Sequence, residues 1–267
     1  MRESYWRCER AIVPGLRSAH CAYYDEVRRA LESEPRLWLD LGCGRELVYG
    51  WLPPHDARLT ARSLSRAGRI VGLDADLASL RDNTQIRDRV LGNVHAGLPF
   101  APATFDLVTA NMVAEHLDEP GECFREIARV LRPGGTLLIH TPNLHSPGIR
   151  FGALLPDALK RALVRIMESD REDDDVFPAF YRVNTRAAMA RAAAAAGLEV
   201  ANLRLVWTTA ATSFLGALAA PELLAIRALD ALGIASLRPN LIATLRAPAP
   251  TPAAEEPLPA GSHRARR

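Results

Sequence analysis

Short apolar runs bounded by glycine, proline or charged residues divide the first half of the chain. The clearest lie at 37–41 and 69–74, and similar runs lie at 105–110 and 136–140. Short runs bounded in this way predict buried strands. Stretches with helical spacing separate them, most clearly 119–131. Strands that alternate with helices predict a parallel sheet with helices on both faces.

The regular alternation stops after Pro142. The stretch 143–183 is irregular and includes an acidic run from Asp170 to Asp175, which is typical of a solvated loop. Regularity returns at Thr185, which is a good N-cap, and a helix is expected to run from there to Gly197, a good C′ residue.

Two further strands are predicted at 198–207 and 241–245. The segment between them, 208–237, is unusually apolar, with Phe214, Leu215, Leu218, Leu223, Leu224, Ile226, Leu229 and Leu232. Charged residues and a proline interrupt it, so it lacks the ~18 apolar residues that a transmembrane helix needs. One interpretation is helices that pack on the sheet or form a dimer face. The other is an interfacial helix that meets a membrane or a lipophilic acceptor.

The composition is that of a soluble globular protein, with 48% hydrophobic and 24% charged residues. A net charge of +2 gives no argument for a nucleic-acid partner. The four cysteines form no C-x-x-C pair, so neither a zinc ribbon nor a redox motif is expected. The first ten residues lack an apolar h-region, so we expect no signal peptide and a cytoplasmic protein.

The strongest chemical feature is an ordered set of glycines and acids: Asp40, Gly42, Gly44 and Asp74. Glycines at a strand's carboxyl end let the backbone approach a ligand, and an acid after the next strand can accept both hydroxyls of a ribose. Dinucleotides and S-adenosylmethionine both fit this arrangement. A dinucleotide fingerprint needs a third glycine where this chain has Leu47, and its acid lies closer, ~20 residues on. S-adenosylmethionine needs no phosphate cradle, and Asp40 would suit its ammonium.

The sequence resembles the class I S-adenosylmethionine-dependent methyltransferases at several motifs in order. Residues 39–44 resemble the first motif and 71–74 the second. Residues 98–100 with 105–108 resemble the stretch through the fourth strand, and 131–137 the turn into the fifth. The subgroup is similar to small-molecule methyltransferases that include quinone- and sterol-methylating enzymes.

The resemblance is close over 36–142 and holds in outline over 185–246. It implies a doubly wound, Rossmann-like α/β fold of seven strands, with the last strand antiparallel in a hairpin with its predecessor. We expect a helical cap at 1–35, a methyltransferase domain at 36–246 and a disordered, proline-rich tail at 247–267. The lid or acceptor pocket would come from 1–35, the variable region 143–183 and the apolar segment 208–237.

The resemblance also implies a role for each motif residue. Gly42, Cys43 and Gly44 would line the methionine part of the cofactor, Asp40 would orient its amino group, and Asp74 would hold the ribose. The remaining cofactor contacts would come from Ala75, Asp76, Asn93, Val94, Asn111 and Met112. Asn93 stands where the family usually has Asp, and an amide can still bind adenine. An alignment shift would put His95 in its place.

Candidates for the acceptor side are fewer. His116, which follows Glu115, is the candidate general base. The alternative is a pair that packs and hydrogen-bonds at the start of a helix. His140, Tyr181 and Arg182 would face the acceptor, with core packing and helix capping as the alternative for the last two. Histidines 140 and 145 with Glu115 fit no metal motif, so no metal is expected.

We therefore expect S-adenosylmethionine-dependent methyl transfer to an O, N or C atom of a small-molecule acceptor, with S-adenosylhomocysteine as product. The acceptor itself and the oligomeric state stay open. The expected partner set includes no nucleic acid and no membrane span, with lipophilicity of the acceptor and peripheral membrane contact as open alternatives. Two other classes also remain: a nicotinamide-dependent oxidoreductase, and a non-catalytic scaffold that binds S-adenosylmethionine.

Overall fold

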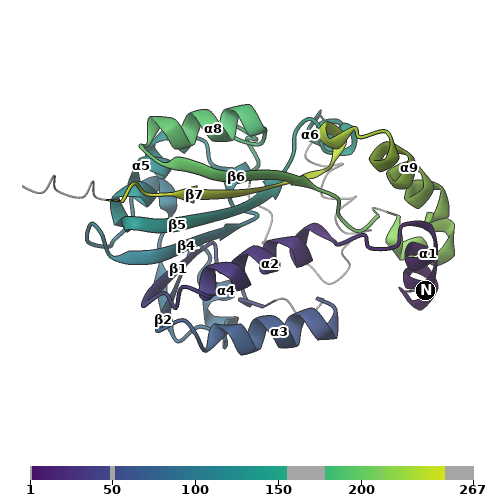
Figure 1. Cartoon of the computed structure of the whole chain (residues 1–267). Helices are drawn as coiled ribbons and strands as arrows, with labels where there is room; N and C mark the ends of the chain where they lie inside the picture. Colours follow the sequence, from purple (N-terminus) through teal and green to yellow (C-terminus); the bar gives the residue numbers. More distant parts are fainter. Residues whose placement is uncertain (1, 49–51, 155–177, 211, 250–267) are drawn as a thin grey trace, which may run out of the picture.

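A seven-stranded sheet forms the centre of the molecule (Figure 1), with the strand order β3-β2-β1-β4-β5-β7-β6. The computed structural model describes residues 2–48, 52–154, 178–210 and 212–249. The acidic run at 170–175 and nearly all of the tail expected to be disordered lie outside these ranges.

Five strands are parallel: β1 (Leu37–Leu41), β2 (Arg69–Asp74), β3 (Asp88–Leu91), β4 (Phe105–Asn111) and β5 (Leu131–Pro142). The last strand, β7 (Asn240–Arg246), runs antiparallel to β5 and to β6 (Glu199–Val206), between which it inserts. The predicted strands and the antiparallel last strand are confirmed. The sequence analysis did not locate β3, which is a four-residue strand with half-buried and exposed residues alternating along it.

Helices cover both faces of the sheet. On one face, α5 (Pro120–Val130) and α8 (Arg186–Ala195) bury Phe124, Ile127 and Met189. On the other lie α2 (Ala19–Leu31), α3 (Pro54–Leu64) and α4 (Leu77–Asp82). The predicted ends of α8 are confirmed, because Oγ1 of Thr185 accepts from the amide of Ala188 and Gly197 follows with a φ of +73°. Among the described residues, the connections also contain α6 (Pro147–Leu154) and four short 3₁₀ helices, η1 (Val94–Ala96), η2 (Ala114–His116), η4 (Ser213–Ala219) and η5 (Ala235–Leu237).

The N-terminal helix and the segment between β6 and β7 meet in a small unit beyond the carboxyl ends of the parallel strands (Figure 1). Here α1 (Arg2–Ile12) packs on η4 and on α9 (Ala220–Ala231). Tyr5, Leu223 and Ile226 form the core of this unit. The apolar segment therefore packs on α1 through η4 and α9, whereas η5 at its end contacts β6. Within the described residues, no helix combines the length and the hydropathy needed to cross a membrane.

Candidate functional site

The chain leaves β1 in a tight turn, 42–44, which we call the glycine turn. Gly42 has a φ of +62° and Gly44 a φ of +52°, both in the left-handed region that favours glycine. A Cβ at Gly42 would lie 2.4 Å from Cγ2 of Val113, so no side chain fits there. The amides of Gly42 and Cys43 both donate to the carbonyl of Leu73, at 2.7 and 3.2 Å. The turn is thereby tied to the end of β2.

A buried asparagine after α4 holds the same turn from another side. The side chain of Asn83 is fully buried, and its Nδ2 donates to the carbonyl oxygens of Gly44 at 3.0 Å and Cys43 at 3.3 Å. Its Oδ1 accepts from the amides of Gln85 and Ile86, at 3.1 and 3.0 Å. Asn83 therefore joins the glycine turn to the loop that precedes β3.

Asp74, the acid at the end of β2, is oriented by two backbone amides. Its Oδ2 accepts from the amide of Gly44 at 2.8 Å, and its Oδ1 accepts from the amide of Asp76 at 2.9 Å. A carboxylate has about four acceptor positions. The two bonds therefore fix the carboxylate and leave acceptor capacity for two hydroxyl donors.

Asp40, the acid within β1, is buried beside a hydroxyl. Oγ1 of Thr109 donates to Oδ1 of Asp40 at 2.5 Å and itself accepts from Nε1 of Trp38 at 2.7 Å. Burial raises the pKa of Asp40 to about 7; the Thr109 bond opposes the rise and the charge of Asp74 adds to it. A cation placed next to Asp40 would favour its ionised form.

A cavity lies between the glycine turn and α2. The sheet contributes Asp40 and Asn111 to its lining, the glycine turn contributes Gly42, and α2 contributes Tyr23, Tyr24 and Val27. Tyr24 also donates its hydroxyl to the carbonyl of Leu47, at 2.8 Å. The second helix of the N-terminal segment is therefore one wall of the cavity. The side chain of Cys43, by contrast, is buried in the core against Gly72, so the cavity meets mainly its backbone.

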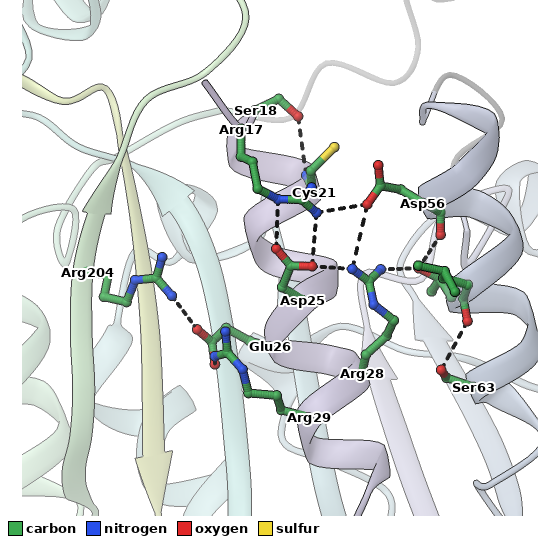
Figure 2. Close-up of polar contacts among 12 residues, drawn as sticks. Arg17, Ser18, Cys21, Asp25, Glu26, Arg28, Arg29, Asp56, Ser63 and Arg204 are labelled. Carbon is green, nitrogen blue, oxygen red and sulfur yellow. Dashed lines mark hydrogen bonds and ion pairs between the residues drawn. The ribbon is translucent and has the colours of Figure 1, made fainter. Parts of the chain in front are cut away.

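Ion pairs on two sides hold α2 in place (Figure 2). On the α3 side, Arg17 bridges Asp25 and Asp56, with distances of 2.9 and 2.8 Å. On the β6 side, Nη1 of Arg204 lies 2.7 Å from Oε1 of Glu26. The side chains of Asp56 and Glu26 are only 9% and 8% exposed, so salt screens these pairs less than exposed ones. The wall formed by α2 is fixed relative to both α3 and the sheet.

The end of β4 approaches the same cavity through a strained residue. Met112 has a φ of +59°, which is uncommon for a residue with a side chain. Its amide donates to the carbonyl of His140 at 2.8 Å. This geometry lets Asn111 line the cavity and brings Val113 against Gly42. Strained backbone of this kind is concentrated at functional sites.

The residues expected near adenine lie just after β2 and β3. Ala75 is exposed, and the Asp76 carboxylate caps α4 by accepting from two amides at 3.1 and 2.7 Å. Asn93 is exposed and caps η1, because its Oδ1 accepts from the amide of His95 at 3.0 Å. Val94 is half-buried beside them. Asp76 and Asn93 thus have structural capping roles that the sequence analysis did not assign.

The candidate base His116 lies in η2. Its Nδ1 is 2.8 Å from the carbonyl oxygen of Pro178, and a carbonyl only accepts, so Nδ1 carries a proton. In the neutral ring the lone pair is then on Nε2. This bond agrees with the packing interpretation of the Glu115–His116 pair. The same bond also fixes the tautomer that a general base at Nε2 would need. Because the bond fits both interpretations, the catalytic role of His116 stays a prediction.

Of the three candidates for the acceptor side, His140 is farthest from its expected place. It is fully buried in β5, so the structure does not bring it to a surface that an acceptor can touch. Tyr181 is half-buried with a φ of +54°, and its amide donates to the carbonyl of Glu115 at 3.1 Å. Burial, aided by the charge of Glu115, raises its pKa. Arg182 is exposed and pairs with Asp118 at 3.1 Å.

Comparison with known proteins finds a similarity over one segment of the chain. Residues 39–139, from β1 into β5, match the sequence model of a methyltransferase domain. This segment is similar to a methyltransferase domain, and we call it the methyltransferase domain. It contains the glycine turn, Asp74 and the end of β4.

Three curated relatives resemble the methyltransferase domain. A probable S-adenosylmethionine-dependent methyltransferase of Mycolicibacterium smegmatis is 34% identical over 151 residues, 55% of this chain and 49% of that protein. A malonyl-[acyl-carrier protein] O-methyltransferase of Hahella chejuensis is 36% identical over 121 residues, 43% and 39% of the two chains. A ubiquinone biosynthesis O-methyltransferase of Xanthomonas campestris is 36% identical over 105 residues, 39% and 42%. The chain therefore spans less than half the length of these relatives.

The structure adds residues to the methyltransferase domain's site that the sequence analysis missed. Thr109 lies directly opposite Asp40 in the register of β1 and β4, so strand order alone would have found it. Asn83 and the two tyrosines of α2 carry no local signal, because only long-range packing places them. Among the described residues, no group of three His, Cys, Asp or Glu side chains is placed to hold a metal ion.

Replacing Asn83 with alanine tests its role in the methyltransferase domain. The change leaves buried carbonyls of the glycine turn without a donor, so the free energy of unfolding should fall by about 1–3 kcal/mol. Chemical denaturation measures this. Asn202→Ala, at an exposed position of β6, is the matched control and should change it by less than about 0.5 kcal/mol. Equal losses in the two variants would contradict the assignment.

Proposed function

We propose that this protein transfers the methyl group of S-adenosylmethionine to an O, N or C atom of a small-molecule acceptor and releases S-adenosylhomocysteine. The observation that carries the proposal is the pair of acids beside the glycine turn. Asp40 suits the cofactor's ammonium, and Asp74 has acceptor capacity for two ribose hydroxyls. Both acids lie within the residues that match the methyltransferase domain.

The other cofactor contacts follow from this orientation. The backbone of Gly42, Cys43 and Gly44 would lie along the methionine part, with Asn111 and Met112 across the cavity. Ala75 and Val94 would contact the adenine. Because Oδ1 of Asn93 already caps η1, its contact with the adenine would come from Nδ2 or the backbone.

A dinucleotide fits the same site poorly. A pyrophosphate site uses a helix N-terminus directly after the glycine turn. Here the described residues that follow the turn, up to Val48, contain no helix, and α3 begins at Pro54. Two acids at the turn would also repel a pyrophosphate. The intact set of Asp40, Asp74 and both glycines likewise argues against a scaffold that has lost cofactor binding.

When bound, S-adenosylmethionine supplies an electrophilic methyl group on its sulfonium. The protein's own contribution is to bind and orient: Asp40 holds the ammonium, Asp74 holds the ribose, and α2 limits access of water from its side. Holding an acceptor in line with the methyl group supplies much of the rate enhancement. For a hydroxyl acceptor we propose that Nε2 of His116 receives the proton. Tyr181 and Arg182 remain our candidates for acceptor contact.

We propose that the acceptor is lipophilic and reaches the site near a membrane surface. The support is the unit of α1, η4 and α9, which exposes Leu215, Leu218, Leu224 and Leu232 by 40%, 75%, 54% and 71%. One relative is named for ubiquinone biosynthesis, which is consistent with such an acceptor. The proposed compartment is the cytoplasm, where the four free cysteines would stay reduced.

Calorimetric titration with S-adenosylhomocysteine tests the function, together with transfer of a labelled methyl group to acceptor pools. Asp74→Ala should weaken binding by about tenfold or more, because bonds to a charged acceptor are lost. Asp88→Ala, which removes a half-buried acid that pairs with Arg69 at the sheet edge, is the control and should bind normally. Heat with NADH but none with S-adenosylhomocysteine would support the oxidoreductase instead.

The pKa of Asp40 predicts how binding depends on pH. Since burial raises this pKa to about 7, the empty site is mostly protonated at pH 6, and an ammonium ligand must displace that proton. Affinity for S-adenosylhomocysteine should therefore rise by roughly tenfold per unit between pH 5.5 and 6.5 and flatten above the pKa. Asp40→Asn should bind weakly and lack this rise. A pH-independent affinity in the unmodified protein would contradict the ammonium contact.

The empty protein should show the opposite trend in stability. The pKa of Asp40 is higher in the folded state than its usual value of 3.8, so folding favours the protonated form. The stabilisation is complete below about pH 4 and is lost as the pH rises through about 7.

Vesicle co-sedimentation tests the lipophilic surface. Leu218→Glu combined with Leu232→Glu should release the protein from vesicles of phosphatidylglycerol and phosphatidylcholine, because the apolar contact becomes charged. Leu91→Glu alters a leucine that is 56% exposed at the opposite edge of the sheet and should leave binding unchanged. If the unmodified protein stays in solution, or Leu91→Glu has the same effect, the surface assignment is wrong.

A further inference from the structure

His140 lies behind the wall of the cofactor cavity, in the centre of the sheet. Its strand, β5, pairs with β4 on one side and β7 on the other, and its side chain is fully buried. Nδ1 of His140 lies 2.7 Å from Oδ1 of Asn111, which lines the cavity. Nε2 lies 3.1 Å from Oδ1 of Asn240. The imidazole ring therefore bridges two asparagine amides.

The number of protons on this ring determines whether each asparagine turns its amide oxygen or its NH₂ group toward it. Burial lowers the pKa of His140 to about 4, so the ring is neutral near pH 7. A neutral imidazole has one N–H and one lone pair, whereas each amide can present either an oxygen or an NH₂. One neighbour must therefore accept from the ring and the other must donate to it.

The two distances indicate which asparagine accepts a hydrogen bond from the ring and which one donates to it. The contact to Asn111, at 2.7 Å, is short for an N–H···O bond, so Nδ1 donates to Oδ1 there. The longer contact, 3.1 Å, joins Nε2 to Oδ1 of Asn240, and a neutral ring that donates from Nδ1 requires this amide to be turned over so that its Nδ2 donates to the lone pair of Nε2. With its oxygen turned toward His140, Asn111 directs its NH₂ group away from the ring, and Asn111 is one of the residues that line the cavity.

We propose that His140 is a positioning residue that fixes Asn111 with its NH₂ facing the cavity, where it donates to the carboxylate of the cofactor's amino-acid end. This inference rests on the proposed function. The cavity then has complementary groups for both charges of the amino acid: Asp40 for the ammonium and Asn111 for the carboxylate. His140 touches neither the cofactor nor the acceptor.

Packing around the ring supports this role, because it prevents the imidazole from turning over. Tyr23 stacks on His140 with centroids 5.6 Å apart, and His20 packs edge-on at 4.8 Å. Tyr23 lines the same cavity. His140 thus supports one residue of the sheet wall and one of the α2 wall. With the ring held, the position of its proton controls the amide of Asn111.

The test compares two ligands that differ by one group: S-adenosylhomocysteine and its decarboxylated derivative, titrated by calorimetry. His140→Phe keeps a ring against Tyr23 and removes both hydrogen bonds. It should weaken S-adenosylhomocysteine by roughly tenfold and change the decarboxylated ligand by less than about threefold. Asn111→Leu should give the same pattern. The double variant should lose no more than Asn111→Leu alone, because both act through one bond.

Each outcome decides the matter. No change in His140→Phe, equal weakening of both ligands, or additive losses in the double variant would overturn the proposal. His140→Gln is the second variant; it keeps an amide donor toward Asn111 and should retain the preference for the carboxylated ligand. Loss of that preference would also count against the proposal. If the unmodified protein binds neither ligand, the proposed function fails first and this inference falls with it.

Discussion

The bond between the glycine turn and the acid of the neighbouring strand is the constraint on which the site depends. The amide of Gly44 donates to Oδ2 of Asp74 at 2.8 Å, and the amides of Gly42 and Cys43 donate to the carbonyl of Leu73. These bonds are available because β1 and β2 are parallel neighbours in register, with Leu41 opposite Leu73. Left-handed backbone at the turn is what aims the amides at β2. The two acids and the turn therefore form one rigid unit.

Much of the fold and the central residues of the site could be predicted from local sequence signals. Apolar runs located most strands, Thr185 and Gly197 marked the ends of α8, and the spacing of glycines and acids indicated the cofactor class. The strand β3 was missed because, at the edge of the sheet, its half-buried and exposed residues alternate without an apolar run. Thr109 was missed because its role beside Asp40 depends on which strands pair.

The misplacement of His140 has a clear physical cause. The apolar run at 136–140 predicts a strand that ends at this residue, which would put the side chain at the rim. In the structure β5 continues to Pro142, because β7 pairs with it as far as Asn240. His140 is therefore flanked by strands on both sides and buried. Burial makes it a support for Asn111, so a residue expected at the acceptor surface becomes part of the cavity's framework.

The two helices of the N-terminal segment pack in different parts of the molecule. Ion pairs to α3 and β6 fix α2 over the cavity, whereas α1 leaves the sheet and packs on α9. The sequence analysis predicted a helical cap here but not its partners, since both contacts join residues far apart in the chain. The result is a cavity with a firmly held wall and, beyond the carboxyl ends of the strands, a separate unit with exposed leucines.

A crystal structure of the protein with S-adenosylhomocysteine is the most direct measurement of the central claim. The account predicts both ribose hydroxyls within hydrogen-bond distance of Asp74 and the ammonium next to Asp40, with the glycine turn unchanged. A nucleoside bound elsewhere, or bound here with its ribose away from Asp74, would contradict it.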